Sequence, residues 1–326
     1  MKKFLLTGAY PYTEQQFAVL RQLGCEVTFL QQEADKIEDC QSYDGVICNG
    51  LFVHHDIKKF EKLQYIQLTS AGFDRVPMDY IREHNIAIHN ARGVYSVPIA
   101  EHTVMLVLNL MRNYRFFCEN QRNHTWNKRR NLTEVYGKTA VIAGCGSIGL
   151  EIAKRLCSFG MNVIGLDVQQ VRFEYLHECR HIDCMQETAR EADVFISSMP
   201  YMEQTHHIFN KDFFAVFNPN GVFVNIARGK LVDEPALIAA LQTHQIKGAA
   251  LDVFEEEPLG ADSALWELDN VIITPHVAGI GFGHLPETEN KIADICCENL
   301  GRYVRGESLI NVVNRATGYR ETMMES

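Results

Sequence analysis

The feature that most constrains this fold is a glycine-rich turn, GCGSIG at residues 144–149, placed between a strand pattern and a helix pattern. The apolar run AVIA precedes the turn, and the stretch GLEIAKRLCSFG follows it before the next strand pattern, NVIGLD. Glycines at this spacing let a chain turn tightly from a strand into a helix. The segment therefore predicts a βαβ unit of a parallel sheet.

The same alternation of strand and helix patterns runs along both sides of this turn. The strand-like runs are KFLLTGA, EVTFL, DGVICNG, LQYIQLTS and IAIHNA before it, and ADVFISSMP, GVFVNIA, KGAALDV and NVIITPH after it. A chain of 326 residues is also longer than one ordinary core requires. We therefore expect an α/β protein with two doubly wound parallel-sheet domains, the second inserted into the first. The helical stretch from about Lys291 is expected to return to the first domain.

Charge and composition exclude several classes of partner. A formal net charge of −10 disfavours nucleic acid and anionic membrane. The longest apolar run, TVMLVLNLM at 103–111, is too short to span a bilayer, and the apolar part of MKKFLLTGAYPY is too short for a secretory leader. Ten cysteines without a C-x-x-C pair indicate reduced thiols and a cytoplasmic protein. HECRHIDC at 177–184 lacks the usual zinc spacing, so we expect no metal.

The glycine turn has the context of a dinucleotide site. Gly144 would permit the tight turn, Gly146 the approach of a pyrophosphate, and Gly149 the close packing of helix on strand. The free N–H groups of the following helix would face the phosphates. Asp167 ends the next strand and would accept hydrogen bonds from an adenosine ribose, while repelling a 2′-phosphate. NAD is therefore favoured over NADP, and Arg172 is the only nearby cation that argues otherwise.

A second feature is the segment GVFVNIARGKLVDEP at residues 221–235. Its apolar run is rich in residues that favour β-strands, and we predict a strand that ends at Arg228, directly before Gly229. A guanidinium at the end of a buried strand requires an anionic partner, because burying an unpaired charge costs too much. From these residues alone, the partner is either another side chain or a ligand.

Four segments in this order resemble a known family: VYGKTAVIAGCGSIG, NIARGKLVDEPAL, GAALDVFEEEPL and NVIITPHVAG. They are similar to the D-isomer-specific 2-hydroxyacid dehydrogenases, and SAGFDRV, HNARGVYSVPIAEHT and NVVNRATGY extend the resemblance more loosely. The resemblance implies a Rossmann-type NAD-binding domain at residues 99–289, inserted into a flavodoxin-like substrate domain made of residues 1–98 and 290–326. Because the sequence stops at Ser326, the short form without a C-terminal regulatory domain is expected.

The family implies a catalytic trio, which falls on Arg228, Glu257 and His276. A planar guanidinium can hold a carboxylate and the neighbouring carbonyl of a 2-keto acid, so the partner of Arg228 would be a ligand. Reduction of the carbonyl needs a proton donor, and histidine suits this role near neutral pH. A neighbouring carboxylate keeps such a histidine protonated.

The resemblance also assigns binding contacts. Ser147 and Ile148 would contact the pyrophosphate, although family members often carry Arg where Ser147 stands. The residues expected to line the nicotinamide half of the cleft are Pro200, Thr205, Ile226 and Asp252. The backbone amides of Ala71 and Gly72 would help to bind the substrate carboxylate.

The segment CNGLFVHHD at 48–56 would form part of the substrate mouth by the same resemblance. Leu51 and Phe52 favour an apolar or small substrate side chain. His54, His55 and Arg92 would instead suit a second acid group. Both alternatives remain open at this point.

Together these patterns predict an NAD-dependent oxidoreductase that interconverts a 2-keto acid and a D-2-hydroxy acid by hydride transfer. The sequence does not identify the acid, the working direction or any assembly beyond a dimer. The resemblance implies a homodimer, and the apolar helix at 101–112 would suit its interface. One alternative is an NADH-sensing, corepressor-like binding protein of the same fold. The other is an NADP-linked glyoxylate or hydroxypyruvate reductase.

Overall fold

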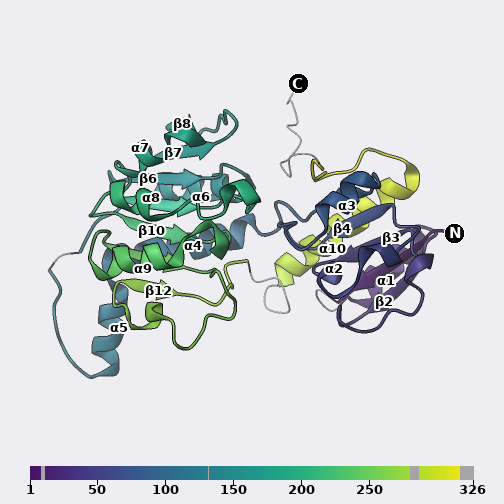
Figure 1. The fold of residues 1–326 in the computed structure, drawn as a ribbon, viewed down its shortest axis with the longest axis horizontal. Coiled ribbons are helices and arrows are strands. Elements are labelled where there is room, and N and C mark those ends of the chain that lie inside the picture. Colours follow the sequence, from purple (N-terminus) through teal and green to yellow (C-terminus); the bar gives the residue numbers. More distant parts are fainter. Residues whose placement is uncertain (9–11, 131, 280–285, 316–326) are drawn as a thin grey trace. The chain divides into compact units, whose positions relative to one another are not determined.

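A computed structural model describes residues 1–8, 12–130, 132–279 and 286–315 of the chain. The chain divides into two compact units (Figure 1). The first unit comprises Met1–Tyr95 and Ile280–Ser326, and the second comprises Ser96–Gly279. Each unit contains one parallel sheet with helices on both faces, which confirms the expected α/β class with two doubly wound domains.

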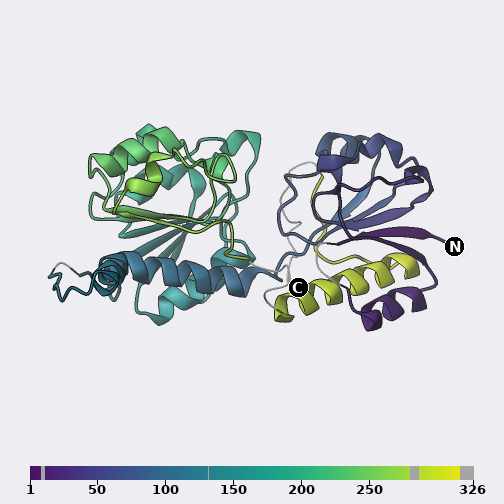
Figure 2. The same ribbon diagram turned by 90° about the horizontal axis from the view of Figure 1, so that it is seen from below.

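The first unit is built on a five-stranded sheet in the order β2-β1-β3-β4-β5. The strands are β1 (Lys3–Thr7), β2 (Glu26–Leu30), β3 (Gly45–Cys48), β4 (Tyr65–Leu68) and β5 (Ala87–His89). The helices are α1 (Glu14–Gln22), α2 (Leu51–His54), α3 (Met78–Glu83) and α10 (Pro286–Arg305). Figure 2 shows α1 and α10 side by side on one face of this sheet, with α2 and α3 on the other. The C-terminal helix therefore returns to the first unit.

The second unit is built on a seven-stranded sheet in the order β12-β11-β10-β9-β6-β7-β8. The strands are β6 (Thr139–Ala143), β7 (Asn162–Asp167), β8 (Glu178–His181), β9 (Val194–Ser197), β10 (Val222–Asn225), β11 (Gly248–Leu251) and β12 (Val271–Ile273). The helices are α4 (Ser96–Arg112), α5 (Tyr114–Arg122), α6 (Ser147–Ser158), α7 (Met185–Ala189), α8 (Lys211–Val216) and α9 (Glu234–Gln242). The chain order reverses between β9 and β6, where open parallel sheets bind their ligands.

The edge strand β8 differs from what the sequence suggested. The segment HECRHIDC is not among the predicted strands, yet Glu178–His181 pairs with β7 in parallel. Arg180 binds Glu178 and Glu191 on the partly exposed edge of the sheet. Because these side chains are polar and incompletely buried, they give no apolar pattern of period two.

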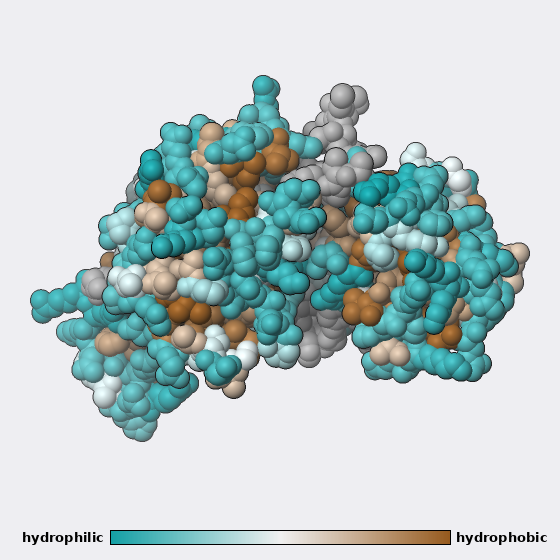
Figure 3. All heavy atoms as spheres, in the orientation of Figure 1, coloured by the Kyte–Doolittle hydropathy of each residue, from teal (hydrophilic) through white to brown (hydrophobic). Residues whose placement is uncertain are grey.

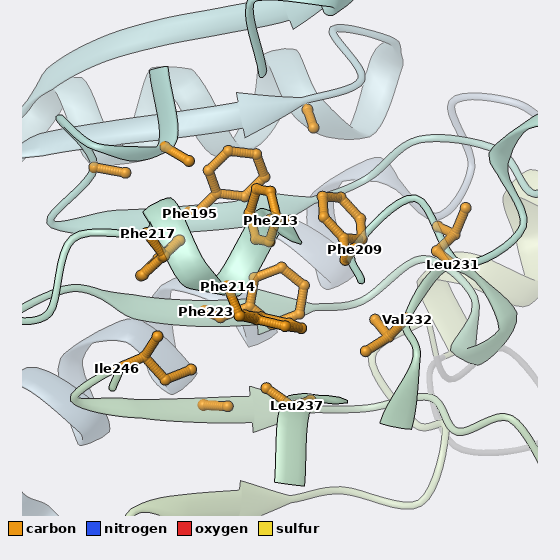
Figure 4. Close-up of a cluster of buried hydrophobic side chains, with 14 of the residues drawn as sticks. Phe195, Phe209, Phe213, Phe214, Phe217, Phe223, Leu231, Val232, Leu237 and Ile246 are labelled. Atoms are coloured by element: carbon orange, nitrogen blue, oxygen red, sulfur yellow. The ribbon is translucent and has the colours of Figure 1, made fainter. Parts of the chain in front are cut away.

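An aromatic cluster fixes the strands that lead to the carboxyl edge of the second sheet. Six phenylalanines fill the space between β9, β10 and α8 (Figure 4): Phe195, Phe209, Phe213, Phe214, Phe217 and Phe223. The rings of Phe195 and Phe213 meet edge to face, with centroids 5.0 Å apart. This rigid packing holds the loops that follow β9 and β10 in defined positions.

The described part of the chain presents an ordinary polar surface. Figure 3 shows mostly hydrophilic side chains on the face in view, interrupted by small apolar areas. Among the described residues, no helix is long and apolar enough to cross a bilayer, and no group of three or more metal-ligating side chains is assembled. All ten cysteines carry free thiols.

Burial of His89 in β5 predicts a loss of stability in acid. Its side chain is 2% exposed and stacks on Tyr65, with ring centroids 5.6 Å apart. Burial lowers the pKa of His89 to about 4. Below the ordinary pKa of histidine, the unfolded chain therefore binds a proton that the folded protein does not. The free energy of unfolding should fall as the pH drops from the pKa of the unfolded state towards that of the folded state, by up to about 3 kcal/mol in total.

Urea unfolding across this range measures the effect. His89→Phe keeps the stacking surface and should remove most of the fall in unfolding free energy at low pH. His84 is an exposed ring stacked on Tyr80, so His84→Phe should leave that pH dependence unchanged. Equal pH slopes for wild type and His89→Phe would contradict this assignment.

Candidate active site

The glycine turn after β6 needs two of its glycines for packing and leaves the third facing open space. Gly144 has a φ of +95°, and a Cβ there would lie 2.7 Å from the backbone nitrogen of Met199. A Cβ at Gly149 would lie 2.1 Å from the carbonyl oxygen of Gly144. A Cβ at Gly146 would meet no atom within 4 Å. Protein packing therefore explains Gly144 and Gly149, while Gly146 leaves room beside the first turn of α6 for a ligand.

Asp167 ties the end of β7 to this turn. One carboxylate oxygen accepts the N–H of Cys145 at 2.8 Å, and the other accepts the N–H of Gln169 at 3.0 Å. Ser147 and Ile148 form the start of α6, where backbone N–H groups lack partners within the helix. A partly exposed carboxylate beside a turn with free N–H groups and open space fits the ribose and pyrophosphate of a dinucleotide.

The three residues of the expected trio follow three neighbouring strands. Arg228 follows β10, Glu257 follows β11 and His276 follows β12. These strands are paired in parallel, with Asn225 opposite Leu251 and Leu251 opposite Ile273. Because carboxyl ends of parallel strands meet at one edge, residues distant in the sequence lie at the same edge of the sheet.

The strand before Arg228 is shorter than predicted. We expected it to end at Arg228, but β10 ends at Asn225. The fully buried side chain of Asn225 accepts the N–H of Ala227 at 3.2 Å and donates to the carbonyl of Arg228 at 2.9 Å, which bends the chain out of the sheet. A Cβ at Gly229 would lie 1.8 Å from the carbonyl carbon of Phe254, so only glycine fits there. The backbone of Arg228 is thus held on both sides.

Glu257 and His276 form a directly bonded pair. The Nδ1 of His276 lies 2.7 Å from a carboxylate oxygen of Glu257, whose other oxygen accepts the N–H of Phe254 at 3.1 Å. His276 adopts a φ of +53°, and its N–H donates to the carbonyl of Asp252 at 2.7 Å. With Nδ1 directed at the carboxylate, Nε2 faces away from it and can exchange a proton with a substrate, while Glu257 stabilises the imidazolium.

Asp252 holds the turn that carries His276. Its carboxylate is 1% exposed and accepts three hydrogen bonds, from the hydroxyl of Thr274 at 2.6 Å and from the N–H groups of Val277 and Ala278, each at 2.9 Å. His102 of α4 bonds the same hydroxyl at 3.1 Å. Burial lowers the pKa of His102, which favours its neutral form here. The expected contact of Asp252 with a nicotinamide stays a prediction.

Replacing Asp252 should loosen this turn. Asp252→Asn places an N–H₂ group against one of the three donors, so the left-handed backbone of His276 loses support. We expect the turnover number to fall about 10- to 100-fold, because His276 is no longer held in position. Thr274→Val, which removes one bond and leaves the carboxylate, should have a smaller effect. Measured turnover numbers that rank the two variants in the opposite order would contradict this role.

The other expected cofactor residues lie after β9 and β10. The hydroxyl of Thr205 accepts the N–H of Met202 at 2.8 Å and donates to the carbonyl of Pro200 at 3.2 Å, which closes the loop after β9. Ile226 is 6% exposed, and its N–H donates to the carbonyl of Ser197. These residues shape the carboxyl edge of the second sheet.

The expected substrate contacts belong to the first unit. Ala71 and Gly72 lie in the loop after β4. The carbonyl of Ala71 accepts a hydrogen bond from Asn90 at 2.7 Å, and that of Gly72 accepts one from Ser70 at 2.8 Å. These bonds fix the path of the loop.

A family model described as "D-isomer specific 2-hydroxyacid dehydrogenase, NAD binding domain" matches residues 104–278. The matched segment contains the glycine turn and all three residues of the trio. The chain belongs to this family. The family's nucleotide-binding domain is therefore present, as the resemblance implied.

Relatives within the dehydrogenase family differ in the substrate that their names state. A D-3-phosphoglycerate dehydrogenase from Methanocaldococcus jannaschii is 36% identical over 96% of this chain, which spans 60% of that protein. A glyoxylate/hydroxypyruvate reductase B from Klebsiella pneumoniae is 32% identical over 79% of this chain and 80% of its own length. An NADPH-dependent glyoxylate/hydroxypyruvate reductase from Sinorhizobium meliloti, solved with NADP and malonate, has a TM-score of 0.79, 26% identity and 99% coverage of both chains.

Two residues that hold loops at the carboxyl edges of the two sheets were missed by the sequence analysis. Asn225 was counted as part of an apolar strand, although a buried amide at a strand end is a signal for a bend. Glu33 lies in the polar segment QQEAD, which has no periodicity. Only the folded chain brings it to its partners in distant loops.

Proposed function

We propose that this protein is a dehydrogenase that interconverts a 2-keto acid and the corresponding D-2-hydroxy acid with NAD as cofactor. The observation that carries this proposal is the arrangement of Arg228 and the bonded pair Glu257–His276 after three adjacent strands of the sheet that also bears the glycine turn. The proposal assigns cofactor binding to residues 99–289 and substrate binding to residues 1–98 and 290–326.

In this mechanism Arg228 binds the substrate carboxylate and polarises the C2 carbonyl through its paired N–H donors. A bound reduced nicotinamide would supply the hydride to C2. His276 donates its Nε2 proton to the oxygen that becomes the hydroxyl, and Glu257 stabilises the histidine while it is charged. In the oxidative direction His276 accepts that proton.

The preference for NAD rests on Asp167. The carboxylate lies at the end of β7 and would repel a 2′-phosphate, and Arg172 is an exposed cation five positions further on. The opposite preference has its own support, because the Sinorhizobium meliloti relative is NADPH-dependent. An NADP-linked glyoxylate or hydroxypyruvate reductase is therefore the second candidate.

Titration with NADH and NADPH distinguishes these two candidates. We expect NADH to bind at least about tenfold more tightly, because one uncompensated like-charge contact costs on the order of 1 kcal/mol or more. Asp167→Asn should bring the dissociation constants of NADH and NADPH closer together. It should also weaken both complexes, since the carboxylate accepts the N–H of Cys145. Asp183→Asn, with a side chain that is 85% exposed, is the charge-matched control. Tighter binding of NADPH to the wild type would favour the second candidate.

Two broader features complete the proposal. The apolar helix α4 would suit a homodimer interface, since its Met105 side chain is exposed and those of Leu108 and Leu110 are half-buried in the single chain. Ten free thiols favour a reducing compartment such as the cytoplasm.

A further inference from the structure

A partly buried contact between two loops of the first unit, from Glu33 to Asn49 and Gly50, bears on which substrates can be distinguished. The order β2-β1-β3-β4-β5 reverses between β1 and β3, and open α/β sheets bind ligands outside the carboxyl ends of their strands at such a reversal. Three loops converge at this edge of the sheet. They follow β2, β3 and β4, and the last of them contains Ala71 and Gly72.

Glu33, from the loop after β2, reaches across this edge. Its carboxylate accepts the N–H of Asn49 at 2.7 Å and the N–H of Gly50 at 2.6 Å, and it also accepts the hydroxyl of Thr7 at the end of β1. Its backbone carbonyl bonds the Nε2 of His55 at 2.8 Å. Both the side chain and the backbone of Glu33 therefore hold residues 49–55.

We infer that Glu33 is a positioning residue that makes this enzyme select 2-keto acids with a neutral side chain over those carrying a second negative charge. The inference rests on the function proposed above, because it concerns the substrate of the proposed reaction. It favours the first of the two alternatives that the segment at 48–56 left open, a small or neutral substrate side chain.

The first reason is that three of the donors a second anionic group could use at this edge are already occupied. The N–H groups of Asn49 and Gly50 point at the carboxylate of Glu33, and His55 is bonded to its carbonyl. A second carboxylate or phosphate would have to displace Glu33 from these bonds.

The second reason is charge. Glu33 places a negative charge at the reversal point, and the side chain of Arg75 passes the same loop, with Cδ 3.7 Å from the position of a Cβ on Gly50. The carboxylate of Glu33 opposes the approach of a second anionic group, which the side chain of Arg75 would attract. Selectivity of this kind works by repelling the wrong substrate.

The third reason is that the rest of the loop is apolar where it packs. Leu51 is fully buried, and the ring of Phe52 meets Phe60 edge to face, with centroids 5.6 Å apart. His54 is exposed and lies at the end of α2. Core packing therefore resists a shift of the loop that would free its N–H groups for a second acid.

The test compares two substrates that differ by a phosphate, hydroxypyruvate and 3-phosphohydroxypyruvate, with the same reduced cofactor. The wild type should favour hydroxypyruvate in kcat/KM by at least about tenfold. Glu33→Gln, which keeps the length and removes the charge, should shift the ratio about tenfold towards the phosphorylated acid, mainly through KM. Glu38→Gln removes an 86% exposed charge from the same connection and should leave the ratio unchanged.

Further measurements separate selectivity from simple loosening of the loop. Glu33→Asp keeps the charge on a shorter side chain, so it should raise KM for both acids while preserving the wild-type ratio. Glu33→Gln turns an N–H₂ group towards one of the three donors, so a small fall in the melting temperature is expected, while NADH affinity should be unchanged. Equal losses on both acids, or an unchanged ratio, would overturn the inference. If the wild type reduces neither these acids nor any other 2-keto acid, the proposed function itself fails.

Discussion

Arg228→Ala should lower kcat/KM for every 2-keto acid by about 10³- to 10⁴-fold, because it removes two charge-assisted donors from the carboxylate and the reacting carbonyl. The site should otherwise persist, since Asn225 and Gly229 hold the backbone of residue 228, and the turn loses only the bond from the guanidinium to the carbonyl of Ala227 at 2.7 Å. NADH affinity should therefore change little. Steady-state kinetics and NADH titration on the same preparation measure the two effects separately.

Two neighbouring variants make this result specific. Arg228→Lys keeps a positive charge but loses the planar fork, so it should recover only a small part of the activity. Lys230→Ala removes an exposed cation two residues further on and should behave as the wild type. A loss of less than tenfold for Arg228→Ala would show that the guanidinium does not bind the substrate.

Gly146→Ala should weaken NADH binding by about 100-fold while leaving the melting temperature unchanged, because burying a misfitted methyl against a ligand costs several kcal/mol. In the protein alone, a Cβ at this position meets nothing within 4 Å, and the backbone has an ordinary φ of −77°. The methyl group conflicts only with a pyrophosphate that approaches the turn.

Two other variants of the turn serve as its controls. Gly149→Ala should instead destabilise the fold, since its Cβ would lie 2.1 Å from the carbonyl of Gly144. Ser147→Ala adds no volume and should weaken NADH binding only a few-fold, by the loss of about one hydrogen bond. Normal NADH affinity in Gly146→Ala would contradict the placement of the cofactor.

The parts of the site that sequence reasoning found are those specified by short segments. The spacing of Gly144, Gly146 and Gly149 between a strand and a helix is a local pattern with a local cause. The trio was assigned through the family resemblance, which short motifs carry, and the strand before each residue places the three at one edge of the sheet. The exact end of β10 was missed because it depends on hydrogen bonds from a buried amide, which no apolar periodicity reports.

The contacts that escaped prediction join residues far apart in the sequence. Glu33 bonds to a loop 16 and 17 residues away, and His102 bonds to Thr274 from a position 172 residues earlier. Strand β8 depends on polar side chains at a sheet edge. In each case the folded backbone brings the partners together, so neither residue type nor spacing predicts the contact.

The central claim is tested most directly by following oxidation of NADH, and of NADPH in parallel, with a panel of 2-keto acids that includes glyoxylate, pyruvate, hydroxypyruvate and 3-phosphohydroxypyruvate. Arg228→Ala serves as the blank, and the configuration of any chiral product is determined. We predict turnover with NADH on at least one acid with a neutral side chain, formation of the D-hydroxy acid, and loss of turnover in the variant. Tight NADH binding without turnover of any acid would contradict the account, as would activity that survives the loss of Arg228.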